Sequence, residues 1–415
     1  MIEAVKKRDG SIVEYNEQKI YTAIDGAFGD LDKQFKDKWI MRDVRKQVNK
    51  LNGIVSVEDI QDLVENVLMQ RKHYDVAKQY IRYRRDHEVA RYEKEKQDFK
   101  KKLMATDVVN QNANVDEHSF GGRIGEAADV VMKNFALEHC MSSMARKNHL
   151  SNEIYIHDLS HYAVGDHNCL SVPFDDLLAN GFNTRQVDIR PANSIDTAFQ
   201  LIAVVFQLQS LQQFGGVSAT HLDWTMVPYV RKSFYKHFRD GIKYIEKNGQ
   251  MPQISSIVDT SINDTVYTRY KAAHEYAVAM TEKEIHQAVE GMYHNLNSLQ
   301  SRSGCQLPFT SVNYGTCTLP EGRMIIKSLL EVSIEGLGAL HKTSIFPCGI
   351  FQSMEGVNRK PGDPNYDLFR LALKSTSVRL YPNYANVEWS GNAGFDRNDP
   401  KTFFSTMGKC KLQLM

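Results

Sequence analysis

The stretch YIHDL at residues 155–159, followed by HNCL at residues 167–170, decides how this sequence is interpreted. It places one cysteine, Cys169, in a setting that suggests redox chemistry. An isolated cysteine in a protein is more commonly buried and behaves as a small hydrophobic residue. Cys169 alone would favour that structural role, whereas the rest of the chain favours the functional one.

The composition indicates a globular protein that can bury a large core. Its 415 residues suggest two or three domains, although a large α/β barrel can exceed the usual domain size. The chain has 51 Lys and Arg against 50 Asp and Glu, so its net charge is close to zero. The surface as a whole therefore does not attract nucleic acid or membrane, and any polyanion must be bound at a local site. The six cysteines form no CxxC pair, which fits a reduced cytoplasm better than a zinc ribbon or a disulfide framework.

The sequence predicts no targeting or membrane segment. The N-terminus lacks the apolar region of a signal peptide, and the longest apolar runs, such as residues 201–206, are far too short to cross a bilayer. We therefore expect a cytoplasmic protein that is not exported and that binds neither membrane nor nucleic acid.

The first 92 residues predict a mainly helical module that contains a β-hairpin. Asp9-Gly10 is a hairpin turn signal, because these two residue types tolerate the positive φ angles of a tight turn. Asn16 is a suitable N-cap for a following helix, whose apolar positions recur at helical spacing. Ser56 is a suitable N-cap for another helix. Asp59 stands three residues later, at the position where a capping box usually has Glu or Gln.

Two more helical stretches are expected at residues 76–92 and 93–102. The second lies in a heavily charged segment, residues 93–109, which we interpret as a linker with a solvated helix face. The second domain is then expected to span residues 110–408, and residues 409–415 form a tail.

The N-terminal module resembles the ATP-cone, the domain through which ribonucleotide reductases sense ATP and dATP. The residues that we expect to bind nucleotide are Val5, Lys7, Arg8, Asp9, Gly10, Asn16 and Lys19. A tight hairpin gathers backbone N–H groups, the basic side chains supply cations, and the N-terminus of the following helix adds a dipole that favours a triphosphate. A basic hairpin without a ligand is the structural alternative. Because ATP-cones also occur outside reductases, this module alone indicates only regulation by nucleotide.

The second domain alternates polar turns with helical and apolar segments, which predicts an α/β architecture. Residues 198–208 predict a buried helix that continues towards Gly215-Gly216, a pair that can serve as a helix C-cap. Residues 296–315 predict the end of a helix followed by a strand. Cys305 and Cys317 bracket that strand at the spacing of no known redox motif, so we expect them to be structural thiols.

The stretches at residues 155–159 and 167–170 resemble the class III, oxygen-sensitive anaerobic ribonucleoside-triphosphate reductases. The resemblance extends from Val5 to Gly408 and includes PFTSVNYG at 308–315, IFP at 345–347 and DPNYD at 363–367. It implies an α/β fold in which the ATP-cone precedes the first part of a ten-stranded glycyl-radical barrel. It also implies reduction of ribonucleoside triphosphates to deoxyribonucleoside triphosphates for DNA synthesis, under allosteric control by ATP and dATP.

The implied chemistry needs a radical, because the ribose C3′–H is not acidic and no general base can start the reaction. A cysteine thiyl radical is suitable since its S–H bond and the C–H bond have similar strengths, and such a radical survives only in a dry, closed barrel. In the family, a glycyl radical near the C-terminus generates the thiyl radical. The resemblance assigns Cys169 to a second cysteine, which delivers hydrogen as the 2′-hydroxyl leaves as water.

The thiyl cysteine of the family lies in a Met-Gly-Cys-Arg motif at a loop tip. In this chain, Met407-Gly408 is followed by Lys409 and Cys410. Cys410 becomes the thiyl residue if one residue has been inserted. Alternatively, the matching sequence ends at Gly408 and the last seven residues are unrelated read-through, as when an intron or frameshift interrupts a gene. We favour the second interpretation and keep Cys410 as a displaced candidate.

The sequence after Gly408 shows no glycyl-radical motif, no four-cysteine zinc site and no second half of the barrel. We therefore assign no metal to this chain. The resemblance implies a homodimer, a missing C-terminal half if the gene is split, and a radical-generating activase that carries an iron–sulfur cluster and S-adenosylmethionine. Formate or a small thiol protein would be the reductant. The alternative is a catalytically incomplete, nucleotide-binding and dimer-forming fragment of such an enzyme.

Overall fold

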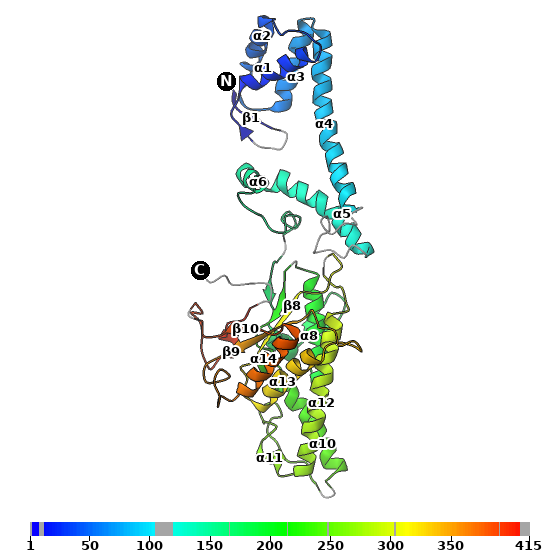
Figure 1. Cartoon of the computed structure of the whole chain (residues 1–415), viewed down its shortest axis with the longest axis vertical. Coiled ribbons are helices and arrows are strands. Elements are labelled where there is room, and N and C mark those ends of the chain that lie inside the picture. Colours follow the sequence, from blue (N-terminus) through cyan, green and yellow to red (C-terminus); the bar gives the residue numbers. More distant parts are fainter. Residues whose placement is uncertain are drawn as a thin grey trace. The chain divides into compact units, whose positions relative to one another are not determined.

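The computed structural model of the chain is shown in Figure 1. The structure describes residues 2–7, 12–103, 119–165, 167–213, 215–246, 249–302, 304–389 and 391–406. The chain divides into two compact units, Met1–Gly165 and Asp166–Met415, and each is described by itself. Among the described residues, no helix combines the length and the apolar character that crossing a bilayer requires.

The first unit begins with a small sheet in the order β2-β1-β3. Its strands are β1 (Ile2–Lys6), β2 (Ile12–Val13) and β3 (Gly53–Ser56). β1 pairs antiparallel with β2, with Val5 opposite Val13, and parallel with β3. The predicted hairpin is therefore confirmed, while its turn residues Arg8–Ser11 lie outside the described residues.

Four helices complete this module: α1 (Glu17–Gly29), α2 (Lys38–Val48), α3 (Val57–Gln70) and α4 (Tyr74–Leu103). Both predicted helix starts are confirmed. The Asn16 side chain accepts a hydrogen bond from the backbone N–H of Gln18 at 2.9 Å, and Ser56 and Asp59 form a reciprocal capping box. Figure 1 shows α1 and α3 beside the first part of α4, which they contact.

The prediction of two separate helices between residues 76 and 102 is wrong, because α4 is one continuous helix. Its sequence contains no Gly or Pro and is rich in Lys, Arg and Glu, so neither a helix-breaking residue nor low helix propensity interrupts it. The charged composition of residues 93–103 therefore does not end the helix, and the domain boundary in this segment stays a prediction.

The apolar side chains of α1, α2, α3 and the start of α4 form the core of this module, together with Val5 and Val55 from the sheet. Ile24, Val64, Leu68 and Val76 are fully buried within it. The remaining elements of the first unit are α5 (Phe120–Phe135), a π-helical turn (Ala136–Cys140) and α6 (Ser143–Leu150).

The second unit is built on a five-stranded, all-parallel sheet in the order β10-β9-β8-β7-β4. The strands are β4 (Leu170–Ser171), β7 (Val217–Ala219), β8 (Thr310–Tyr314), β9 (Cys348–Ser353) and β10 (Asn383–Asn386). A parallel sheet that alternates with helices confirms the predicted α/β class. The ten-stranded barrel itself stays a prediction.

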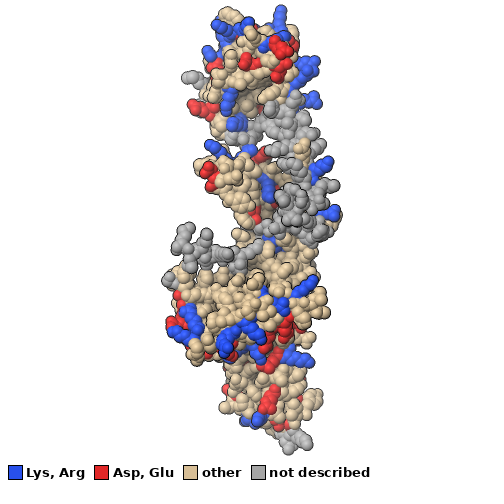
Figure 2. Space-filling view, viewed as in Figure 1, with Lys and Arg blue, Asp and Glu red and all other residues tan. Residues whose placement is uncertain are grey.

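Five longer helices connect these strands: α8 (Ile195–Ser210), α10 (Val227–Tyr244), α12 (Lys271–Leu296), α13 (Pro320–Glu335) and α14 (Tyr366–Arg379). The shorter elements are α7 (Phe174–Asn180), β5 (Phe182–Asn183), β6 (Asp188–Ile189), α9 (Leu222–Thr225), α11 (Thr265–Thr268) and η3 (Pro400–Thr402). On the face seen in Figure 2, Lys and Arg side chains are interspersed with Asp and Glu, as the formal net charge of +1 suggests.

The two faces of the large sheet differ in character. Apolar side chains such as Val217, Val312 and Phe351 join a core that includes residues of α8, α10, α12, α13 and α14. Because successive side chains of a strand point to opposite faces, the intervening residues project from the other face. That second face, which we call the polar face, carries Ser171, Ser218 and Ser311 in register on three neighbouring strands, and also Asn313 on β8 and Gln352 on β9.

Candidate functional site

Cys169 lies at the edge of the polar face. It immediately precedes β4, and Leu170, which follows it, pairs with Val217 and donates its N–H to the carbonyl oxygen of Gly216 at 3.0 Å. The alternation of side chains along β4 gives Cys169 the same orientation as Ser171, towards the polar face. Cys169 is half-buried, and its Sγ lies 3.9 Å from Oδ1 of Asn168. Its surroundings therefore differ from those of a cysteine packed in an apolar core.

Gly215 allows the chain to pass close to Cys169. A Cβ atom at Gly215 would lie 1.5 Å from the carbonyl oxygen of Asn168, so only glycine fits without moving the backbone. The interpretation of the Gly-Gly pair as the C-cap of α8 is wrong, because that helix ends at Ser210 and is capped by Leu211. Gly215 instead allows the residues before β7 to lie against the residues before β4.

At the opposite end of the polar face, two buried amide side chains bind the last described segment of the chain. Asn313 on β8 forms hydrogen bonds with both the N–H and the carbonyl group of Thr406, each at 3.1 Å. Gln352 on β9 donates from Nε2 to the carbonyl oxygen of Phe404 at 3.1 Å. Residues 404–406 therefore lie on the same sheet face from which Cys169 projects.

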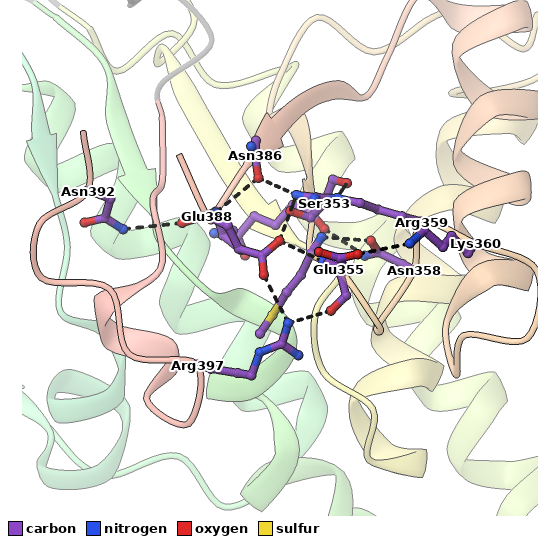
Figure 3. A network of polar contacts seen from close by, with 12 residues as sticks. Ser353, Glu355, Asn358, Arg359, Lys360, Asn386, Glu388, Asn392 and Arg397 are labelled. Atoms are coloured by element: carbon purple, nitrogen blue, oxygen red, sulfur yellow. Dashed lines mark hydrogen bonds and ion pairs between the residues drawn. The ribbon is translucent and has the colours of Figure 1, made fainter. Parts of the chain in front are cut away.

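A network around Glu388 fixes the chain that leads to this segment (Figure 3). The Glu388 carboxylate lies 3.0 Å from Nη2 of Arg359 and 3.0 Å from Nη2 of Arg397, and it accepts the backbone N–H of Glu355 at 2.9 Å. Two arginines on one carboxylate, with a backbone donor, make a charge-assisted set of hydrogen bonds. The set holds the loop after β10 against the loop after β9.

Asp175, His221 and Thr220 form a hydrogen-bonded row where β4 and β7 end. Nε2 of His221 lies 2.9 Å from the Asp175 carboxylate, and Nδ1 lies 2.7 Å from the Thr220 hydroxyl. Burial raises the pKa of Asp175, but hydrogen bonds from His221 and Thr225 outweigh it, so the pKa is lowered overall. An ionised Asp175 favours the tautomer with the proton on Nε2, which leaves Nδ1 to accept the Thr220 proton. Such a row can move a proton.

The first unit has a surface pocket of about 520 Å³ beside α1. Its lining residues are Asn16, Gln18, Lys19, Thr22, Ala23, Gly26, Ala27, Asp30 and Tyr83. Of the predicted nucleotide-binding residues, Asn16 and Lys19 therefore line one pocket, Val5 is buried in the core, and Lys7 is exposed outside this pocket. Arg8, Asp9 and Gly10 lie outside the described residues.

The predicted site also includes residues that the structure does not describe. Cys410, with Met407 and Gly408, lies in residues 407–415, outside the described part of the chain. Cys317 is buried, and burial raises the pKa of its thiol far above the ordinary range. Within the described residues, no group of three or more His, Cys, Asp or Glu side chains is placed to hold a metal ion.

Sequence reasoning missed Asn313, Gln352 and Asp175 as site residues. A signal was present for the first two, because each amide interrupts an otherwise apolar or small-residue strand, in TSVNY and CGIFQS. Buried polar side chains generally have hydrogen-bond partners, so such an amide indicates one. The sequence could not identify that partner, since Thr406 lies 93 residues from Asn313.

Two family models match the chain. The model described as "ATP cone domain" matches residues 3–89, and the model described as "Anaerobic ribonucleoside-triphosphate reductase" matches residues 111–415. A solved structure described as the anaerobic ribonucleotide reductase from Thermotoga maritima in complex with dATP and CTP covers 71% of this chain and 47% of that chain, at 15% identity. The TM-score between the two structures is 0.45.

Curated relatives give a stronger comparison. The anaerobic ribonucleoside-triphosphate reductase of Haemophilus influenzae is 30% identical over 393 residues, which are 92% of this chain and 52% of that protein. The protein of the same name from Escherichia coli is 29% identical over 391 residues, or 92% of this chain and 51% of that protein. The chain thus spans about half the length of these relatives. As one family model covers most of the chain and a relative at 30% identity aligns with 92% of it, the chain belongs to the anaerobic ribonucleoside-triphosphate reductase family.

Proposed function

We propose that this chain is the N-terminal part of an enzyme that reduces ribonucleoside triphosphates to deoxyribonucleoside triphosphates for DNA synthesis. The observation that carries the proposal is the shared orientation of Cys169 with the polar side chains of β7, β8 and β9 on one face of the sheet. Membership of the anaerobic reductase family supports the same reaction. The domains are proposed as residues 1–92, 93–109 and 110–408, with residues 409–415 as a tail.

In this proposal, Cys169 delivers hydrogen to the ribose as the 2′-hydroxyl leaves as water. A thiyl radical, generated from a glycyl radical of the complete enzyme, starts the reaction by removing the C3′ hydrogen. Ser218 and Ser311 lie on the same face and carry hydroxyl groups that can both donate to and accept from the hydroxyls of a sugar. Loss of water needs a proton, and the row of Thr220, His221 and Asp175 at the end of β7 is suited to move one.

The N-terminal module is proposed to bind ATP or dATP as an effector. The match to the ATP cone domain supports this assignment. The pocket beside α1 has the size of small-molecule sites, which measure about 300–1,000 Å³. Lys19 brings a cation to that pocket, and the N-terminus of α1, with Asn16 as its cap, adds a dipole that attracts negative charge.

The same family membership suggests the partners. These are a second copy of the chain, the remaining half of the enzyme, and an activase that carries an iron–sulfur cluster and S-adenosylmethionine. Formate or a small thiol protein would supply the reducing electrons. We infer that the complete assembly works in the cytoplasm.

A second candidate is a nucleotide-binding, dimer-forming fragment without catalytic activity. The length of the chain favours this second candidate, since the chain spans about half of each relative. An anaerobic assay of CTP reduction with activase and reductant separates the two candidates. Turnover by the 415-residue chain alone would exclude the candidate without catalytic activity. Turnover only after the C-terminal half is added supports the proposed reaction and makes the isolated chain incomplete, whereas no turnover in either case contradicts the proposed reaction.

A further inference from the structure

We propose that Asn313 and Gln352 are positioning residues, which fix residues 404–406 at a defined place on the sheet face from which Cys169 projects. The first part of this inference, the fixing of the segment, stands on its own contacts. The second part, its importance for turnover, rests on the proposed function.

Asn313 pairs with Thr406 as a neighbouring strand would. Its Oδ1 accepts the N–H of Thr406 and its Nδ2 donates to the carbonyl oxygen of the same residue, both at 3.1 Å. The side chain is fully buried, and its Nδ2 also donates to Ser218 Oγ at 3.1 Å and to the carbonyl oxygen of Ala219 at 2.9 Å. The amide thus connects β7, β8 and the segment, and each bond helps fix its rotamer.

Gln352 makes a second attachment two residues earlier in the segment. Its side chain is also fully buried, and Nε2 donates to the carbonyl oxygens of Thr220 at 3.2 Å and Phe404 at 3.1 Å. Two attachments, at Phe404 and at Thr406, define the direction of the segment as well as its position. A single attachment would leave it free to pivot.

The pairing of the strands does not itself require an amide at either position. A buried amide costs free energy unless its hydrogen bonds are made, and an apolar residue can occupy this face, as the fully buried Ile350 does opposite Asn313. Both amides also bond to β7 or to Thr220, which follows it, and their bonds with Phe404 and Thr406 add residues 404–406 to the same network. Packing alone does not require an amide at either position.

The attachment point lies on the same sheet face as Cys169. Asn313 is on β8, two strands from β4, and is level with Thr220, whereas Cys169 is level with Gly216. With ~4.8 Å between strands and ~3.3 Å per residue, the two sheet positions are about 16 Å apart. The hydrogen bonds with Asn313 and Gln352 therefore hold residues 404–406 on the face from which Cys169 projects.

The test measures amide hydrogen exchange of residues 404–406, at single-residue resolution, in the 415-residue chain. Asn313→Ala should speed exchange of the Thr406 amide by about five-fold or more, because that N–H loses its acceptor. Asn383→Ala is the matched control, since it removes a strand amide of β10 and should leave Thr406 unchanged. If Asn313→Ala does not fold, Gln352→Leu keeps the buried volume and should speed exchange at Ser405 and Thr406. Unchanged exchange in the folded variants would overturn the inference.

The second readout is turnover by the complete enzyme that contains this chain. Asn313→Ala should lower kcat by about ten-fold or more, with KM and the glycyl-radical signal in EPR unchanged, because only the approach of the reacting groups is disturbed. Faster exchange with unchanged kcat would show that the segment is held without serving turnover, which overturns the second part alone. The proposed function is tested separately by the Cys169→Ser variant, assayed for conversion of CTP to dCTP. Failure of the proposed function is therefore distinguishable from failure of this inference.

Discussion

Oδ2 of Asp223 lies 2.9 Å from the backbone nitrogen of Gly315, the first residue after β8. The same oxygen accepts the N–H groups of Thr316 and Cys317 at 3.0 and 2.9 Å. Asp223 is fully buried, and burial raises its pKa although these backbone donors oppose the effect. One carboxylate thus satisfies three consecutive N–H groups at the end of the strand that carries Asn313.

Asp223→Ala is expected to destabilise the chain by about 3 kcal/mol or more, because it leaves three buried N–H groups without an acceptor. Asp223→Asn keeps one oxygen acceptor and should cost less. Urea unfolding followed by circular dichroism gives the free energy of unfolding. Asp188→Ala, at an exposed position of β6, is the control and should change that free energy by about 0.5 kcal/mol at most. Equal effects of the two alanine variants would contradict this role for Asp223.

The lowered pKa of Asp175 predicts that the stability of the fold depends on pH. Its folded-state pKa is lowered, so its ionised form stabilises the fold above the unfolded-state pKa of about 3.9, and this contribution is lost as pH falls through the folded-state value. Asp175→Asn should therefore cost about 1–2 kcal/mol at pH 7 and progressively less below about pH 4. The neighbouring, exposed Asp176→Asn is the matched control. A difference from wild type that does not change with pH, measured by urea unfolding, would exclude this contribution.

Gly215→Ala is expected to destabilise the second unit by about 3 kcal/mol, because its Cβ would overlap the carbonyl group of Asn168. Displacing Asn168 also moves Cys169, so the rate of Cys169 alkylation, followed by mass spectrometry, should change with it. Gly291→Ala in α12 is the control, since its Cβ meets no atom within 4 Å and alanine favours a helix. A stable Gly215→Ala variant with unchanged alkylation would show that the close approach has no consequence.

Gly26→Leu should block nucleotide binding to the first unit. Gly26 lines the pocket beside α1, and a Cβ there meets no protein atom within 4 Å, so a larger side chain projects into the pocket without disturbing the helix. Gly29→Leu is the matched control, as Gly29 is equally unobstructed but is not a lining residue. Isothermal titration calorimetry with dATP should show binding weakened at least about ten-fold in the first variant and unchanged in the second. Equal affinities would place the nucleotide elsewhere.

The sequence predicted those features that depend on neighbours along the chain. The hairpin of β1 and β2, the N-cap Asn16 and the capping box of Ser56 each follow from residues within a few positions of one another. Features that join distant segments were not predictable. Gly215 meets Asn168 across 47 positions, and its role as a close-approach glycine, rather than a helix cap, depends on how two strands enter the sheet. Asn313 and Thr406 are separated by 93 positions, and no local pattern connects them.

The central claim is that Cys169 takes part in ribose reduction rather than in packing. It is tested most directly by Cys169→Ser in the complete enzyme that contains this chain, activated anaerobically and assayed for conversion of CTP to dCTP. A serine keeps the size and hydrogen bonding of the side chain but cannot give up its hydrogen atom as readily as a thiol. We predict a normal glycyl-radical signal by EPR and no detectable dCTP. Formation of dCTP by the serine variant at a rate near that of the wild type would contradict the account and make Cys169 a structural residue.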